Sequence, residues 1–249
     1  MWNKAIIFPV AACLFLMSCG PSLKERKEKA DIHYRTGEVQ FAEKNYSVAL
    51  EELMKAVKLK PLDASYRNML GLTYFAKKMH FEALKEFNEA VRLSPDYSEA
   101  HLNAGAVALE LKDFDTAIAH FKAAAGNILY KTPEYAWNNL GWAYYNKGMY
   151  ANAVESYKKA IEAVPDYQMA YYNMGLAYDK MNKTDEASQA FKRTVELAPN
   201  FVDAHYQLGL ASIRRKDKDT ARQSFGRVME LVPQSDKARS AKEYLDLLK

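Results

Sequence analysis

Residues 134–167 read EYAWNNLGWAYYNKGMYANAVESYKKAIEAVPDY and contain two amphipathic patterns joined by a short polar segment. In the first half, Leu140 precedes Tyr144 by four residues, and in the second half Ala153 precedes Tyr157 by the same spacing. Residues three and four apart lie on one stripe of an α-helix, so each half predicts an amphipathic helix. The stretch therefore predicts a pair of helices connected by a tight turn.

The same pattern recurs along most of the chain. Glycines recur at spacings of 34, 34, 36, 34 and 34 residues, and a set of alanines recurs at the same five spacings. Both residue types show the same two extra residues in the same unit, which indicates a true internal repeat. Prolines, which cannot continue a helix, close five of the units. The recurring residues are Gly37, Gly71, Gly105, Gly141, Gly175 and Gly209; Ala49, Ala83, Ala117, Ala153, Ala187 and Ala221; and Pro61, Pro95, Pro165, Pro199 and Pro233.

A period of 34 residues with these small and aromatic positions resembles the tetratricopeptide repeat, a pair of antiparallel helices. The resemblance implies an all-α fold, a right-handed α-solenoid of six repeats that ends in a C-terminal capping helix. A mid-helix glycine costs about 1 kcal/mol relative to alanine, so its recurrence indicates that the paired helices need a close approach. The predicted units are 30–63, 64–97, 98–133, 134–167, 168–201 and 202–235, and the predicted cap is 236–249.

The two ends of the repeat array differ from its middle. The first unit has Thr36 and Gln40 where leucine and a large aromatic residue are usual, which predicts an exposed end. After the last unit, apolar side chains follow helical spacing and are expected to cover the sixth repeat. These residues are Ala238, Ala241, Tyr244, Leu245 and Leu248.

A hydrophobic leader precedes the repeats. Residues 1–19 read MWNKAIIFPVAACLFLMSC, with a 13-residue apolar stretch over 5–17. This stretch is shorter than the roughly 20 residues that span a bilayer as a helix and is typical of a secretory signal peptide. Its last four residues, Leu-Met-Ser-Cys, resemble the lipobox of bacterial lipoproteins. We interpret 1–18 as a lipoprotein signal peptide, and the resemblance implies that cleavage leaves Cys19 as a lipidated first residue.

An ordinary signal peptide that happens to contain a cysteine is the alternative. If Cys19 carries two or more acyl chains, the mature protein is stably anchored to a membrane. Gly20 is not an acidic inner-membrane retention signal of the enterobacterial kind, which favours the periplasmic face of the outer membrane. We interpret 19–29 as the lipidated cysteine and a polar tether, whose ten residues after the cysteine span at most about 35 Å.

The composition of the 249-residue chain limits the kinds of partner and metal site that it can have. Hydrophobic residues make up 49% and charged residues 27%, which predicts a folded chain. The net charge of +4 comes from 35 basic and 31 acidic side chains, a mixed pattern that gives no reason to expect a nucleic-acid partner. Both cysteines, Cys13 and Cys19, lie in the leader, so the repeats hold no disulfide framework and no thiolate metal site.

Motifs for catalysis are missing from the sequence: it contains no phosphate-binding glycine loop, no HExxH and no G-x-S-x-G. His33, His101 and His205 occupy the fourth position of their units, which a packing role explains better than metal binding. We therefore predict that the protein is not an enzyme. We expect no catalytic residue, no cofactor, no metal ion and no small-molecule substrate.

A groove along the first helices is the predicted partner site. The resemblance implies that positions 2, 5, 6, 9, 12 and 13 of each unit line a concave face that binds peptides. Aromatic rings there would hold apolar side chains, and asparagine amides would bond to the backbone of the partner. The alternative is that rings such as Trp142 and Tyr172 pack between neighbouring helices. The predicted groove residues are Asn68, Leu72, Asn103, Asn139, Trp142, Tyr145, Tyr172, Asn173, Leu176, Tyr206 and Leu210.

The join between the third and fourth units is irregular and adds two residues. Residues 127–134 read NILYKTPE, and Asn139-Leu140-Gly141 follow. We expect Thr132 to be the N-cap of the next helix and Pro133 its first residue. The run resembles the N-P-L-Y-x-T-P-E…N-x-G segment of the pilotin lipoproteins of type IV pili, the PilF/PilW/Tgl family, with Ile128 in place of the usual proline.

This resemblance implies that the protein binds a secretin subunit and promotes its insertion or multimerisation in the outer membrane, without nucleotide or metal. The anchor on Cys19 would confine the adaptor and its client to one membrane surface and raise their effective concentration. Two alternatives stay open. One is a general envelope adaptor that brings cell-wall hydrolases or proteases together. The other is a lipid-anchored subunit of an outer-membrane protein insertion complex.

Overall fold

The computed structural model describes residues 22–249, and this part of the chain folds into thirteen α-helices with no β-strand. Twelve of the helices form six consecutive pairs, and the thirteenth packs on the last pair. The predicted all-α repeat fold is confirmed. The helices are α1 (Leu23–Ala42), α2 (Tyr46–Leu59), α3 (Ala64–Ala76), α4 (His80–Leu93), α5 (Ser98–Glu110), α6 (Phe114–Gly126), α7 (Pro133–Asn146), α8 (Tyr150–Ala163), α9 (Gln168–Lys180), α10 (Thr184–Leu197), α11 (Val202–Arg214), α12 (Lys218–Leu231) and α13 (Asp236–Leu247).

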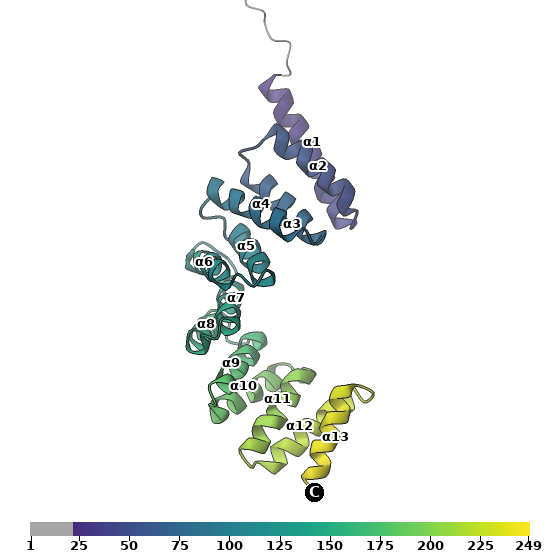
Figure 1. Ribbon diagram of the computed structural model, residues 1–249, viewed down its shortest axis with the longest axis vertical. Helices are drawn as coiled ribbons and strands as arrows, with labels where there is room; N and C mark the ends of the chain where they lie inside the picture. Colours follow the sequence, from purple (N-terminus) through teal and green to yellow (C-terminus); the bar gives the residue numbers. More distant parts are fainter. Residues whose placement is uncertain (1–21) are drawn as a thin grey trace, which may run out of the picture.

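The pairs stack in chain order into an elongated, curved solenoid, with α1 at one end and α13 at the other (Figure 1). Within a pair the two helices pack on each other, and the second helix of each pair packs on the helix that follows it. The two ends of the stack stay far apart (Figure 1). Such a molecule has a chain of small cores instead of one central core. No helix in residues 22–249 has the length and apolar character needed to cross a membrane.

Close contact between a glycine and a large side chain holds the two helices of each pair together. A Cβ atom built on Gly141 of α7 would lie 2.5 Å from Cε1 of Tyr157 in α8, and one on Gly71 of α3 would lie 2.7 Å from Cδ1 of Phe87 in α4. Real Cβ atoms do not approach carbon so closely, so alanine cannot fit without movement of the ring. The first pair uses Leu53 in place of an aromatic ring, opposite Gly37.

The first helix begins earlier than the sequence predicted. Ser22 and Glu25 form a capping box: the Ser22 Oγ accepts from the Glu25 N–H at 3.2 Å, and a Glu25 carboxylate oxygen accepts from the Ser22 N–H at 2.7 Å. This pair satisfies two N–H groups that a helix start leaves without partners. The expected tether over 19–29 is therefore wrong for residues 23–29, which belong to α1. Residues 1–21, with Cys19 and the predicted signal peptide, lie outside the described residues.

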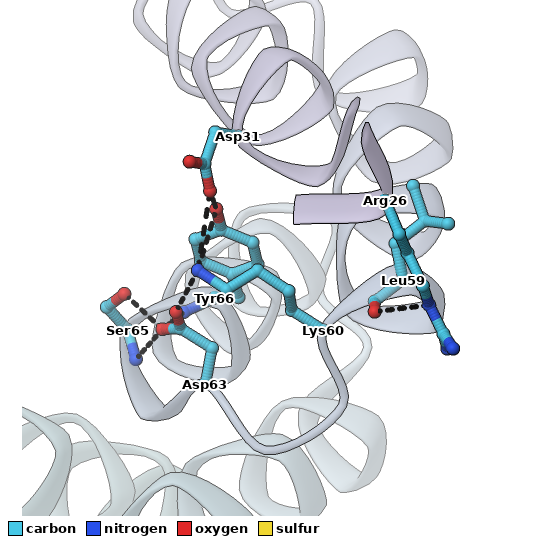
Figure 2. A network of polar contacts seen from close by, with 7 residues as sticks. All are labelled: Arg26, Asp31, Leu59, Lys60, Asp63, Ser65 and Tyr66. Atoms are coloured by element: carbon cyan, nitrogen blue, oxygen red, sulfur yellow. Dashed lines mark hydrogen bonds and ion pairs between the residues drawn. The ribbon is translucent and has the colours of Figure 1, made fainter. Parts of the chain in front are cut away.

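A polar network fixes α1 to the loop between α2 and α3 (Figure 2). The Lys60 ammonium lies 3.3 Å from Asp31 of α1 and 2.8 Å from Asp63 at the start of α3. The Tyr66 hydroxyl also donates a hydrogen bond to Asp31. That hydrogen bond, together with the Lys60 charge, holds the pKa of Asp31 below its usual range. On the other side of α1, Arg26 Nε donates to the Leu59 carbonyl at 3.0 Å.

At the irregular join, Pro133 is the first residue of α7 and Thr132 its N-cap, as predicted, but no side-chain hydrogen bond from Thr132 caps the helix. Asn127 orders the loop instead. Its amide nitrogen donates to the Asp96 carbonyl at 3.0 Å and to Ser98 Oγ at 2.8 Å, and its side-chain oxygen accepts from the N–H of Leu129 at 3.0 Å. The extra residues therefore form a fixed turn.

The predicted cap is confirmed by the contacts of α13. Ala241 and Leu248 are buried against Phe225 and Val228 of α12. The Tyr244 ring stacks on the Phe225 ring, with centroids 5.1 Å apart and an interplanar angle of 11°. The apolar surface that a seventh repeat would otherwise bury is thus covered by a single helix.

Two glycines provide a test of the packing between paired helices. Gly141→Ala should lower the free energy of unfolding by about 1–3 kcal/mol, since the new methyl group overlaps the Tyr157 ring. Gly226, inside α12, has no atom within 4 Å of an added Cβ, so Gly226→Ala should raise stability by up to about 1 kcal/mol through helix propensity alone. Urea unfolding midpoints of the two variants compare the effects. Equal shifts of the same sign would contradict the packing explanation.

Candidate protein-binding groove

A hollow of about 290 Å³ opens between the third and fourth repeats, and we refer to it as the α5–α7 hollow. It is formed mainly by α5 and α7, the first helices of their units, with one ring from α6. The space exists because position 9 of the third unit is Ala106, where the fourth unit has Trp142. The lining residues are Ala106, Leu109, Glu110, Phe121, Asn139, Trp142 and Asn146.

Trp142 is the large exposed aromatic side chain of this hollow. Its side chain is 36% exposed, and its ring stacks on Tyr145 with centroids 5.1 Å apart and an interplanar angle of 6°. Tyr145 in turn contacts Tyr150 edge to face at 5.4 Å. Burial, with the neighbouring Tyr150 as a lesser cause, raises the pKa of Tyr145. One face of the Trp142 indole is thus covered by Tyr145, and the residue lines the hollow.

The rim of the hollow is polar. Glu110 is exposed, and its carboxylate lies 3.4 Å from Nδ1 of His80 in the preceding unit. Asn139 is half-buried and Asn146 is exposed, and the Asn146 amide nitrogen donates to the Trp142 carbonyl at 2.7 Å. The arrangement can accept an apolar side chain inside and bond polar backbone atoms or a cationic group at its edge.

The predicted asparagines divide into two kinds. Asn68 is buried: its amide nitrogen donates to the Tyr97 hydroxyl at 3.3 Å, and its oxygen accepts from Asn103 at 2.9 Å. In the same way, Asn173 is buried and donates to Asn138 at 3.0 Å. These two amide bridges link the first helices of neighbouring repeats. The expected role as backbone-binding amides is therefore wrong for Asn68 and Asn173, and among the predicted asparagines only Asn139 lines the hollow.

The remaining predicted rings lie mostly between helices. Tyr172 packs on Phe201 with centroids 4.8 Å apart and also contacts Phe191. Tyr206 contacts Phe225 and Tyr244 at centroid distances of 5.8 and 6.5 Å. Burial raises the pKa of Tyr172. For these two residues the alternative of inter-helix packing describes the observed contacts.

The predicted leucines are also partly buried. Leu72, Leu176 and Leu210 pack at the edges of three of the small cores. Leu109, Glu110 and Asn146, which the sequence prediction did not include, line the hollow instead. They stand at positions 12 and 13 of their units, which are among the predicted groove positions, so the repeat pattern could have identified them.

Two of the histidines predicted to have packing roles, His33 and His101, contact the second helix of their own repeat. The third, His205, differs, since its Nε2 lies 2.9 Å from the Pro199 carbonyl in the preceding unit. His101 Nδ1 and His120 Nδ1 lie 3.0 Å apart, and His101 Nε2 lies 3.0 Å from the Pro95 carbonyl. Burial and the neighbouring His101 lower the pKa of His120 to about 4. In the first unit, at the same positions, His33 contacts Glu52 at 2.6 Å. Among residues 22–249, no group of three or more histidine, cysteine, aspartate or glutamate side chains is placed to hold a metal ion.

The stacked helix pairs and the open α5–α7 hollow are typical of a helical-repeat interaction scaffold. Family models described as tetratricopeptide repeat match residues 34–98 and 80–130, 134–167 and 169–201, and 203–235. The chain belongs to the tetratricopeptide repeat family. Proteins of this fold are generally scaffolds for protein interaction and not catalysts.

Solved structures share the fold over most of the chain. A structure of PilF from Pseudomonas aeruginosa matches with a TM-score of 0.72 and 19% identity, covering 88% of this chain and 99% of that one. PilW, described as a widely conserved type IV pilus biogenesis factor, matches with a TM-score of 0.73 and 18% identity, covering 86% and 98%. At this identity the likeness shows the fold alone.

The relatives that match by sequence are longer proteins, and the match covers only part of each of them. BBSome complex member BBS4 from Mus musculus is 38% identical over 145 residues, which cover 57% of this chain and 28% of that protein. The same protein from Bos taurus is 26% identical over 136 residues, 54% of this chain and 26% of that protein. The chain thus spans about a quarter of the length of these relatives, and the match reflects the shared repeat.

The amide bridges can be tested by truncation. Asn173→Ala should lower the free energy of unfolding by about 1–3 kcal/mol, because it leaves the buried oxygen of Asn138 without its donor. Asn152→Ala removes an exposed amide of α8 and should stay within about 0.5 kcal/mol of the parent. Urea unfolding of both variants measures the difference. An equally small effect of the two substitutions would show that the bridge contributes nothing.

Proposed function

We propose that the protein is an outer-membrane lipoprotein adaptor, a pilotin, that binds the type IV pilus secretin and promotes its localisation or multimerisation. The observation that carries the proposal of a protein partner is the α5–α7 hollow, where an exposed Trp142 ring borders an unfilled apolar space. Exposed aromatic rings beside a pocket are typical centres of protein binding.

Three observations support the secretin as the client. The repeat fold extends over nearly the whole of PilF and PilW, and PilW is itself described as a type IV pilus biogenesis factor. The lipobox-like run before Cys19 is typical of an anchored envelope protein. The NILYKTPE join is similar to the segment that distinguishes the pilotin family from other repeat proteins, and Asn127 holds it in a fixed turn directly before α7, which carries Trp142.

The mechanism follows from the site and the anchor together. An apolar side chain of the secretin would enter the α5–α7 hollow and contact Trp142 and Leu109, while Asn139 bonds to the adjoining backbone. The lipid on Cys19 would hold the complex at the membrane where the secretin assembles. Restricting both partners to one surface raises their effective concentration without a further contact.

The client assignment is tested in the source cells by deleting the gene and restoring variants. Deletion should abolish heat-stable secretin multimers, and the parent gene should restore them. Trp142→Ala should restore them poorly, because it removes the ring at the hollow, and should weaken secretin binding by roughly tenfold or more, a loss typical of an interface hot spot. Phe81→Ala, which truncates a strongly exposed ring of α4 outside the hollow, is the matched control.

Unchanged secretin multimers after deletion would eliminate the pilotin assignment. Co-purification of cell-wall hydrolases, proteases or barrel-insertion subunits with the protein would then favour one of the two broader adaptor roles. If Trp142→Ala and Phe81→Ala behave alike, the secretin contacts another surface.

The anchor is tested separately. Cys19→Ala should release the protein from the outer-membrane fraction into the periplasm, because the residue that would carry the acyl chains is gone. Fractionation followed by immunoblotting measures the distribution. Retention of the variant on the membrane would show that something other than the lipid holds it there.

A further inference from the structure

The early start of α1 changes the geometry of the proposed anchor. Ser22 is the N-cap of α1, so only three peptide units separate it from Cys19. Three residues span at most about 11 Å, in place of the about 35 Å that a ten-residue tether would allow. If Cys19 lies at the membrane surface, the first turn of α1 must lie there too.

The surface that would meet the membrane is the start of α1 together with the end of α2 and the loop that leads to α3. We call residues 22–29 and 58–63 the N-terminal tip. Leu23 is 86% exposed and Leu62 is 75% exposed, and both border the same hollow of about 450 Å³. Nothing in residues 22–249 covers these two leucines. Exposed large apolar side chains grouped in this way mark a contact surface.

Charge is concentrated at the same place. The N-terminal tip holds six basic and three acidic side chains, a net charge of +3. The whole chain has a formal charge of +4, of which Lys4 lies outside the described residues, so the rest of the described chain sums to zero. Basic side chains near an anionic bilayer are attracted to it. The two leucines therefore stand within a segment of the described chain that carries a net charge of +3.

The tip is also rigidly held. Arg26 Nε donates to the Leu59 carbonyl at 3.0 Å, and Lys60 bridges Asp31 of α1 and Asp63 of the loop at 3.3 and 2.8 Å (Figure 2). These contacts fix the loop that carries Leu62 against the helix that carries Leu23. The two leucines are presented as a single surface, and docking them would orient the whole first repeat.

We propose that the N-terminal tip docks on anionic lipid headgroups, with Leu23 and Leu62 inserted at the bilayer interface and the lysines around them on the lipid phosphates. This inference rests on the proposed lipid anchor at Cys19. The docked tip fixes the angle at which the solenoid leaves the membrane and, with it, the height of the α5–α7 hollow above the surface. A partner is then met at a set distance from the bilayer.

The test uses the full chain, produced in a bacterium that processes lipoproteins and checked for acylation by mass spectrometry. Leu62→Cys is labelled with a polarity-sensitive fluorophore and reconstituted into phosphatidylcholine vesicles that contain phosphatidylglycerol and a headgroup-nitroxide lipid. The label at position 62 should be quenched severalfold more than a label on Leu247→Cys. Leu247 is a matched control, since it is 82% exposed at the opposite end of the solenoid.

Charge variants give a second measurement on the same vesicles. Lys27→Gln should lower the ratio of docked to free tip about fivefold when phosphatidylglycerol is present, and much less without it. Lys242→Gln, an exposed lysine of α13, should change nothing. High salt should weaken docking of the parent protein, because exposed charges are screened.

The outcomes distinguish a failure of the docking proposal from a failure of the proposed lipid anchor. An acylated protein whose label at position 62 is quenched no more than the label at position 247 would overturn docking and leave the anchor intact. A label shielded from aqueous iodide but not quenched by the lipid would mean that a protein surface covers the tip, which also overturns it. A chain without acyl groups would overturn the anchor and the docking together.

Discussion

The structure depends on how closely two helices can approach within one repeat. A glycine on the first helix meets a ring or leucine on the second at a distance that leaves no room for a methyl group, and this contact recurs six times. The approach fixes the angle of each pair and buries its alanines, such as Ala153 and Ala117, completely. The stacking of pairs, the curvature of the solenoid and the position of each first helix follow from it. The groove is therefore a product of small residues as much as of the large ones that line it.

Much of this was predictable because the constraint is local and periodic. The spacing of glycines and alanines gave the number of units, the helix pairing and the cap, and the shared two-residue shift located the irregular join. The start of α1 was missed because residues 23–29 are so rich in charge that they looked like a tether. The Ser22–Glu25 capping box was the available signal. Loop conformation was harder: residues with positive φ such as Lys78 and Lys112 close the turns within the repeats, and lysine gives no hint of that backbone state.

The candidate site was only partly predictable for a different reason. Which first-helix side chains face the groove depends on how one repeat sits against the next, and that relation is not contained in the pattern of a single repeat. Asn138 and Asn139 are neighbours in sequence, yet one bonds to Asn173 in the next repeat and the other borders the hollow. The space beside Trp142 arises from a small residue, Ala106, in the preceding unit. A groove in a solenoid is thus formed by side chains from neighbouring repeats, whereas the sequence pattern mainly reports contacts within one repeat.

The two amide bridges also bear on the mechanics of the solenoid. They join α3 to α5 and α7 to α9, whereas the interface of α5 with α7, at which position 5 is Leu102, has no such bridge. Rotation at that interface breaks no bridge of this type, whereas rotation at the interface on either side would break one. A change in the angle between α5 and α7 would therefore alter the width of the α5–α7 hollow and leave both amide bridges intact.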